Sequence, residues 1–446
     1  MSESLINGLY IVPILGVLIL IHEIGHFMAA RMIGVKVEEF GIGIPPRLKG
    51  WRHKGVLWSL NWIPFGGFVK VLGEDSRSGD PESINSKSPA QRAVFLGAGS
   101  FMNFALAFVL MILVVGVQGI STSNVYIADV AADSPAMAAG WEAGDRIVEV
   151  AGVAIESSTD VGARTREFAG RPLSVVIERE KTFIETSVTP RIDPPPGEGA
   201  TGVGINDAAI ADAKVETVVA DSPAGVAGFL PDDRIVSIDG TPVNDSFGLQ
   251  FGLLHAANST VSIEVQRGNE RVALPLALPA LDPEGNMFTQ VGLDVRITPI
   301  FQRVPLGSVI PVGIAQAWEQ TGMMLAGIRD LVTGQAPFSQ LAGPIGMGQI
   351  TSEIVAESPL PLWVTLAQLA VLLSLNLAVL NLLPIPALDG GRLLFVVIEV
   401  LRGGKKLAPE REGIVHFAGL VLLLGFMFVV AFLDIGRLLQ GRSFLP

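Results

Sequence analysis

The stretch Ile21-His22-Glu23-Ile24-Gly25-His26 places two histidines and a glutamate inside a run that is otherwise apolar from residue 9 to residue 30. At 3.6 residues per helical turn, His22 and His26 lie on one face, so both imidazoles can bind one metal ion while Glu23 leans toward its water. A charged residue in a membrane helix costs about 2.5 to 3.5 kcal/mol, so its presence indicates a function. The pattern H-E-x-x-H therefore predicts a zinc site inside a membrane helix.

The composition indicates a membrane protein. Of the 446 residues, 49% are hydrophobic and only 17% are charged, and the mean hydropathy is +0.50, which is high for a soluble protein. The chain has no cysteine, which excludes disulfides and thiolate zinc sites, so a metal would need His, Asp or Glu. A net charge of -12 argues against nucleic acid as a partner.

Charge and hydropathy together predict a four-span topology. Four apolar runs can cross a bilayer as helices: 5–30, 93–117, 362–383 and 413–433. The first lacks the basic start of a signal peptide, so we expect it to be retained. Residues 31–92 hold ten Lys and Arg, and residues 384–412 hold five more, so both loops should be cytoplasmic. The termini and residues 121–360, with 30 acidic against 14 basic residues, should then lie on the opposite side.

The first cytoplasmic loop contains two predicted strands, at 35–43 and 56–64, with alternating apolar residues. We expect membrane-associated β-hairpins with Trp51, Trp58 and Trp62 in the membrane interface; a solvated hairpin is the alternative. Residues 74–91 are polar and turn-rich and are expected to be a linker.

The acidic region contains a gapless repeat at an offset of 88 residues. Asp133-Ser134-Pro135-Ala136 matches Asp221-Ser222-Pro223-Ala224, and Asp145-Arg146-Ile147-Val148 matches Asp233-Arg234-Ile235-Val236. Each copy resembles the circularly permuted bacterial PDZ domain, and Gly202-Val203-Gly204-Ile205, expected to open the second copy, resembles its carboxylate-binding loop. PDZ domains bind extended peptides at a sheet edge; two inert spacer domains are the alternative.

Two segments follow the repeats. Residues 311–332 have apolar residues at helical spacing, which predicts an amphipathic helix that leans on the membrane or on the repeats. Leu341-Ala342-Gly343-Pro344-Ile345-Gly346 is expected to break that helix, and its residue types indicate no chemical role.

Two histidines leave a catalytic zinc one protein ligand short. The candidate is Asp389 in the stretch 381–391, where prolines end the third span and Gly390-Gly391 lets the backbone fold back. The predicted topology brings this aspartate to the membrane side on which His22 and His26 lie. One carboxylate and one hydroxide would also neutralise Zn²⁺, which lowers the cost of burying it at membrane depth.

These residues resemble the site-2 intramembrane zinc metalloproteases, which carry H-E-x-x-H on helix one and N-x-x-P-x-P-x-L-D-G after helix three. The two PDZ copies and the stretches 41–45 and 63–70 look like the type called regulator of sigma-E protease, although Phe68 stands where that type has tyrosine. The resemblance implies one Zn²⁺ per chain on His22, His26 and Asp389, with Glu23 as general base. It also implies that Asn381 lies near the substrate. Asn376 is a second candidate substrate contact, but it precedes Asn381 by five residues, so the two need not share a face.

The resemblance implies a multi-domain membrane protein: a four-helix transmembrane bundle, membrane-associated β-hairpins and two extramembrane PDZ domains. The expected segments are 1–34 (helix 1), 35–92 (strand loop), 93–120 (helix 2), 121–200 and 201–298 (PDZ domains), 299–361 (amphipathic region), 362–392 (helix 3) and 393–446 (loop and helix 4).

By the same resemblance, the protein would reside in a bacterial inner membrane, with its termini and PDZ domains in the periplasm and its zinc near the cytoplasmic side. Its partners would be the lipid bilayer and single-span substrates, such as an anti-sigma factor already shortened on its outer side, or remnant signal peptides. An idle PDZ scaffold is one alternative, which the intact motifs disfavour. A zinc transporter is another, disfavoured because Glu23 would then be an unneeded base.

Overall fold

The computed structural model describes residues 3–74, 79–179, 181–195, 198–282, 286–334, 341–358, 360–405 and 409–439. The chain divides into two units: Met1–Gln118 together with Val304–Pro446, and the inserted Gly119–Arg303. The expected linker 74–91 lies partly outside the described residues, at 75–78. We describe each unit separately.

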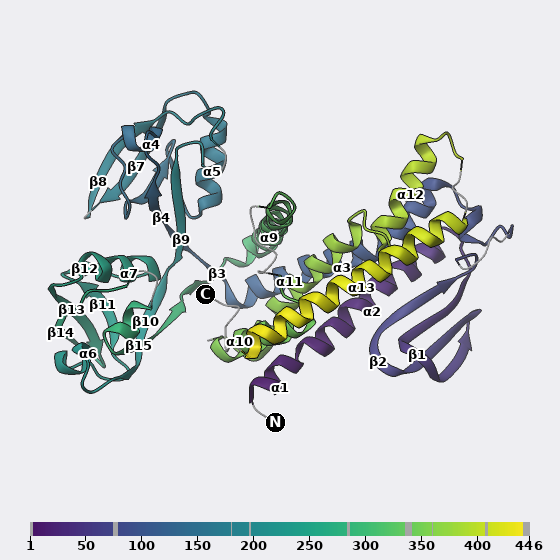
Figure 1. The fold of residues 1–446 in the computed structure, drawn as a ribbon, viewed down its shortest axis with the longest axis horizontal. Coiled ribbons are helices and arrows are strands. Elements are labelled where there is room, and N and C mark those ends of the chain that lie inside the picture. Colours follow the sequence, from purple (N-terminus) through teal and green to yellow (C-terminus); the bar gives the residue numbers. More distant parts are fainter. Residues whose placement is uncertain are drawn as a thin grey trace. The chain divides into compact units, whose positions relative to one another are not determined.

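The first unit is built on the four predicted spans (Figure 1). Its helices long and apolar enough to cross a membrane are Ser4–Met32, Pro89–Gln118, Leu362–Leu382 and Arg411–Leu439. They correspond to α1 (Glu3–Leu9) with α2 (Ile11–Met32), α3 (Pro89–Gln118), α11 (Leu362–Leu382) and α13 (Pro409–Leu439). The four-span prediction from hydropathy is therefore confirmed.

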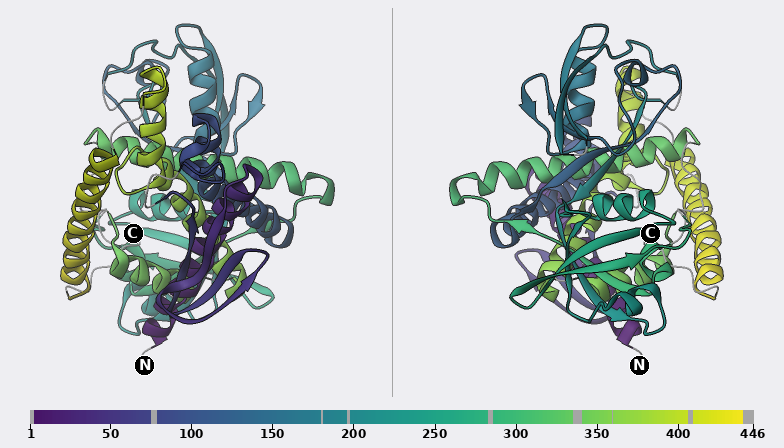
Figure 2. Two further views of the ribbon diagram at one scale, coloured as in Figure 1. Left: turned by 90° about the vertical axis from the view of Figure 1, so that its right-hand side faces the viewer. Right: turned by 90° about the vertical axis from the view of Figure 1, so that its left-hand side faces the viewer.

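Helix α3 is central because α2 and α11 both pack against it. Buried side chains such as Leu18, Ala107 and Leu375 fill these contacts. Small residues let membrane helices approach closely, and a Cβ on Gly25 of α2 would come 2.4 Å from the carbonyl oxygen of Ala98 in α3. Only 6% of the apolar window of α13 is buried, and Figure 2 shows this helix at the margin of its unit. Most of α13 is therefore available to lipid.

The strands between α2 and α3 are longer than predicted: β1 (Val37–His53) and β2 (Val56–Val71) form a long curved antiparallel ribbon (Figures 1 and 2). The ribbon folds back, because Gly41 of β1 pairs with both Ser59 and Phe68 of β2. Among the residues that the structure describes, the final segment of β2, 67–71, pairs with β1 on one side only. Trp51 and Trp62 are exposed, as an interfacial position requires. Trp58 is not; its ring packs 5.0 Å from that of Phe40.

The inserted unit contains two domains with one topology, which confirms the repeat. The first repeat domain has sheet order β8-β7-β5-β4-β9, and the second has β14-β13-β11-β10-β15. The strands of the first are β4 (Ser123–Val130), β5 (Arg146–Val150), β6 (Val153–Ala154), β7 (Leu173–Arg179), β8 (Thr182–Val188) and β9 (Val203–Ala209). Those of the second are β10 (Ala211–Val218), β11 (Arg234–Ile238), β12 (Thr241–Pro242), β13 (Thr260–Arg267), β14 (Glu270–Ala277) and β15 (Leu293–Pro299). The short helices are α4 (Pro135–Ala138), α5 (Ser158–Glu167), α6 (Pro223–Ala227), α7 (Ser246–His255) and α8 (Met287–Gln290).

A buried ion pair explains the repeated Asp-Arg-Ile-Val. Asp145 is 1% exposed and accepts from Arg179 Nε at 2.6 Å; Asp233, 88 residues later, is 0% exposed and accepts from Arg267 Nε at 2.8 Å. A buried carboxylate needs such a partner. Each pair links the turn before a central strand to the hairpin beside it.

The expected start of the second copy was wrong. The stretch at 202–205 leads into β9, and Ile205 pairs with Ile127 of β4. This strand therefore closes the first repeat domain, and the boundary falls after Ala209 instead of at residue 200. The local sequence of a strand does not show which strand it pairs with, and here the second domain begins directly after β9. The repeat offset alone therefore could not assign β9 to the first domain.

Two helices follow the insertion. Helix α9 (Val309–Val332) has the predicted amphipathic character, but its small residues Gly313, Ala317 and Thr321 are the buried ones, and the helix packs on α3. Ile310 and Trp318 are exposed. The stretch at 341–346 begins α10 (Pro344–Glu357), and the Gly346 N–H donates to Oδ2 of Asp434 at 2.8 Å. It thus starts a helix whose N-terminus stabilises a fully buried carboxylate of α13.

Candidate metal centre

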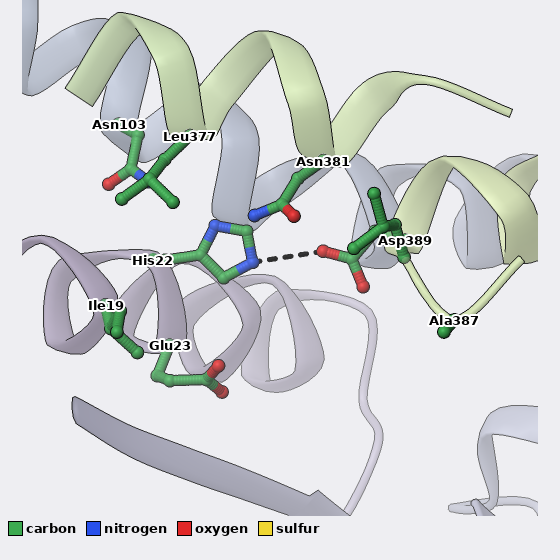
Figure 3. Close-up of a pocket in the computed structure, with 9 residues that line it drawn as sticks. Ile19, His22, Glu23, Asn103, Leu377, Asn381, Ala387 and Asp389 are labelled. Carbon is green, nitrogen blue, oxygen red and sulfur yellow. Dashed lines mark hydrogen bonds and ion pairs between the residues drawn. The ribbon is translucent and has the colours of Figure 1, made fainter. Parts of the chain in front are cut away.

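Three predicted metal ligands meet at one point. His22 and His26 come from α2, and Asp389 is the first residue of α12 (Asp389–Leu401), a helix that the sequence did not predict. The Nε2 of His22 lies 3.0 Å from Oδ2 of Asp389 (Figure 3) and 3.1 Å from Nε2 of His26, and His26 Nε2 lies 3.2 Å from the same oxygen. Both histidines are 7% exposed.

The donor set fits zinc. A tetrahedral Zn²⁺ with bonds of about 2.0 to 2.1 Å holds its ligand atoms roughly 3.3 Å apart, close to the observed separations. The set of three leaves a fourth position for water or substrate, as in catalytic zinc sites. The other ring nitrogen of His26, Nδ1, lies 2.9 Å from the carbonyl oxygen of Phe95. This contact orients the ring so that Nε2 faces the metal position.

The turn between α11 and α12 requires its glycines. A Cβ on Gly390 would lie 2.2 Å from the carbonyl oxygen of Leu383, and one on Gly391 would lie 2.3 Å from that of Ile385. The segment 383–386, which precedes Asp389, therefore packs in close contact with the first turn of α12. The Ala387 N–H donates to Nδ1 of His416 at 3.0 Å, which fastens the turn to α13.

Two ion pairs hold α12 on its neighbours. Arg92, in the first turn of α3, donates to Glu399 at 2.6 Å, and both side chains are largely buried. Arg392 donates to Glu74 at 2.9 Å. Because α12 begins with Asp389, these contacts also help to set the carboxylate against the histidines.

Glu23 lies beside the metal ligands and is not one of the three converging groups. Glu23 and Val69, the latter in the segment 67–71 of β2, line one cavity together with His26 and Asp389. Glu23 borders a cavity of about 240 Å³ that is lined also by His22, Asn381 and Asp389. This position suits a base that serves a water on the metal.

Of the two predicted asparagines, the structure brings one to the cavity. Asn381 is part of its lining, next to His22 and Glu23 (Figure 3). Asn376 is not among the described residues that line it. The two side chains do not share a face, as their spacing of five residues indicates.

Sequence reasoning missed the contribution of α3. Gly99 lies against both imidazoles: a Cβ there would be 2.5 Å from Cε1 of His22 and 2.6 Å from Nε2 of His26. Asn103, one turn later and 0% exposed, lines the same cavity. A signal existed, because an amide within the apolar run 93–117 is costly unless it has a function.

Two histidines and an adjacent glutamate in a helix that can span a membrane, together with an aspartate at the start of α12, define the site of a membrane metalloprotease. The model of Peptidase family M50 matches residues 10–426, and the chain belongs to this family.

Relatives agree over nearly the full length. The chain is 30% identical to zinc metalloprotease RasP of Oceanobacillus iheyensis, over 95% of this chain and 97% of the relative. It is 28% identical to the regulator of sigma-E protease RseP of Escherichia coli, again over 95% and 97%. Among solved structures, the PDZ domain of an SdrC-like protein from Listeria monocytogenes is 21% identical, covering 19% of this chain and 90% of that one, with a TM-score of 0.18.

Proposed function

We propose that this metalloprotease cuts peptide bonds within the transmembrane segments of single-span membrane proteins. The observation that carries the proposal is the convergence of His22, His26 and Asp389 beside Glu23, at a cavity lined by residues of three predicted spans. The proposal requires that the carboxylate of Glu23 be essential for cleavage and dispensable for metal binding.

The chemistry follows from these side chains. His22, His26 and Asp389 would hold one Zn²⁺, which when bound lowers the pKa of a water to about 7 and polarises a carbonyl group. Glu23 would accept a proton from the attacking water and return it to the leaving amine.

Substrate would bind as an added strand. A helical substrate must unwind before a carbonyl can be attacked, and its freed backbone groups need partners within the membrane. The segment 67–71 of β2 pairs with β1 on one side and passes next to Glu23, so its other edge can accept an extended peptide. The Asn381 amide can bind a further backbone group.

Two relatives carry protease names, and one of them is named regulator of sigma-E protease. The substrates we propose are an anti-sigma factor and remnant signal peptides.

An idle scaffold and a zinc transporter are disfavoured by the same geometry. A scaffold has no use for three converging metal donors, and a transporter has no use for Glu23, which is not part of the donor set.

We place the protein in a bacterial inner membrane, with the zinc near the cytoplasmic side and the repeat domains in the periplasm, from the distribution of basic loops. The native chain has no cysteine, so single cysteines at the exposed positions Ser86 and Ser259 can test this. An impermeant maleimide added to the periplasmic side should label Ser259→Cys, whereas Ser86→Cys should react only after the inner membrane is permeabilised. Equal labelling of both from the periplasm would contradict the topology.

We propose further that the repeat domains, as a PDZ tandem, exclude substrates with bulky outer domains. They occupy the whole connection between α3 and α9. A shared polar contact joins them: Asn124 and Tyr126 of the first domain donate to Asp245 of the second at 2.6 and 2.9 Å. Burial, together with the Asp245 charge, raises the pKa of Tyr126 well above its usual value, so it remains a donor. The pair can therefore act as one bulky body.

Peptide docking in the second domain is less well supported than exclusion. Within the core of the second domain, a cavity of about 10 Å³ remains, too small for more than about one water. Its lining includes Leu249 of α7, Phe288 of α8 and Leu293 of β15. A peptide side chain could enter this cavity only if its lining residues moved.

Removing the tandem should let the enzyme cleave full-length substrate that has not been shortened beforehand. Strands β3 (Ile120–Ser121) and β16 (Phe301–Gln302) pair with each other, so a short Gly-Ser linker can replace residues 123–299. Ile235→Asp, which puts a charge into the core of the second domain, should have the same effect, and Thr241→Asp at an exposed position should not. Cleavage of full-length and shortened substrate is measured side by side. If the deletion variant still cuts only shortened substrate, the exclusion proposal is wrong.

A further inference from the structure

Helix α3 presents a polar face to the metal site. Gly99 packs against His22, and Asn103 follows four residues later on the same side of the helix. In Figure 3, Asn103 and Asp389 lie on opposite sides of the His22 ring. Asn103 is fully buried, and its backbone oxygen accepts from Ser374 Oγ of α11 at 2.8 Å. This bond fixes the backbone of Asn103 between α3 and α11, and its carboxamide lies at the cavity.

The two histidines differ in how their second ring nitrogen is paired. Nδ1 of His26 contacts the Phe95 carbonyl, whereas Nδ1 of His22 is buried and has no hydrogen-bond partner among the described residues. Both polar atoms of the Asn103 carboxamide are also buried and unpaired within the described part of the chain. A buried donor or acceptor left without a partner is costly. Two such groups border one cavity.

We propose that Asn103 is a positioning residue for His22: its Oδ1 accepts the Nδ1–H of His22 when Nε2 binds the metal. Metal-binding histidines generally donate their other N–H to an oxygen, which selects the tautomer with a free Nε2 lone pair. His26 has this support from Phe95, and Asn103 would supply it for His22. This inference rests on the proposed zinc site.

Ser100 is the matched control. It lies on the same helix, is 0% exposed, and its hydroxyl is also unpaired among the described residues. It is not part of the cavity lining that contains His22 and Asn103. A general effect of removing a buried polar group from α3 would therefore appear in Ser100→Ala as well as at position 103.

The test compares zinc affinity in full-length protein purified in detergent, by competition with a chelator. Asn103→Leu keeps the shape and removes the acceptor, so it should bind zinc about 10- to 100-fold more weakly. Asn103→Asp keeps an acceptor oxygen and should retain zinc affinity within about threefold, as should Ser100→Ala. The absorption spectrum of the Co²⁺-substituted protein should change in Asn103→Leu and be restored in Asn103→Asp.

Each other outcome is decisive. Normal zinc affinity in Asn103→Leu with a raised KM would make Asn103 a substrate contact and overturn the inference. A loss in Ser100→Ala equal to that in Asn103→Leu would overturn it too. If Asn103→Leu does not fold, Asn103→Asp becomes the test. Weakened zinc binding by folded Asn103→Asp, which keeps an acceptor oxygen, would overturn the inference. Failure of the proposed zinc site is recognised separately, because His22→Ala would then bind zinc as wild type does.

Discussion

Glu23→Gln is expected to reduce peptide-bond cleavage by roughly 10²- to 10⁴-fold, the usual contribution of a general base, while the protein keeps about one zinc. The glutamine has the same shape but cannot accept the proton of the attacking water. Zinc should remain because Glu23 lies outside the group formed by His22, His26 and Asp389. Cleavage of a single-span substrate in proteoliposomes and metal content of the same preparation are the two measurements.

The ligand variants provide the comparison. His22→Ala and Asp389→Ala each remove one of three donors, so both should lose zinc and cleavage together. Full cleavage by Glu23→Gln would refute the assignment of the base. Loss of zinc from Glu23→Gln, with activity lost only for that reason, would make Glu23 a ligand instead.

Gly99→Ala is expected to remove zinc binding and cleavage, although Gly99 has no side chain and touches no substrate. The added methyl would lie 2.5 Å from Cε1 and Nε2 of His22, closer than non-bonded carbon atoms can approach. Separating α2 from α3 would break their close packing at Gly25 and Ala98. The imidazoles must therefore move, and a displacement of about 1 Å can cost 10²-fold in rate.

Gly97→Ala tests whether any extra methyl on α3 has this effect. Nothing lies within 4 Å of a Cβ at Gly97, so this variant should bind zinc and cleave substrate as wild type does. Zinc content and cleavage rate of the two variants are compared after equal purification. If Gly99→Ala and Gly97→Ala gave the same zinc content and cleavage rate, the position of the imidazoles would not depend on the missing side chain at Gly99.

The sequence predicted what depends on short-range periodicity. His22 and His26 share a face because a helix repeats every 3.6 residues, and the four spans follow from runs long enough to cross a bilayer. The distribution of basic residues brought Asp389 to the same membrane side as the histidines. The prolines in the motif at 381–391 also predicted the end of the third span, which stops at Leu382.

Other features depend on contacts that local sequence does not encode. The pairing of β9 with β4, the packing of half-buried Trp58 on Phe40 and the contact of Asp434 with Gly346 each join residues at least 18 positions apart. Composition indicated that these residues could be buried or paired, but it did not name their partners. Only the folded chain brings those partners together.

The same distinction applies within the metal site. Residue type and helical spacing identified His22, His26, Glu23 and Asp389, because ligand chemistry requires particular side chains. Gly99 and Asn103 acquire their importance only from the packing of α3 against α2, where a missing side chain leaves room for two imidazoles and a buried amide borders His22. Sequence determined which groups can bind a metal. Tertiary packing decided which neighbours hold these groups in place, because the contacts between helices depend on the shapes of side chains across the whole bundle.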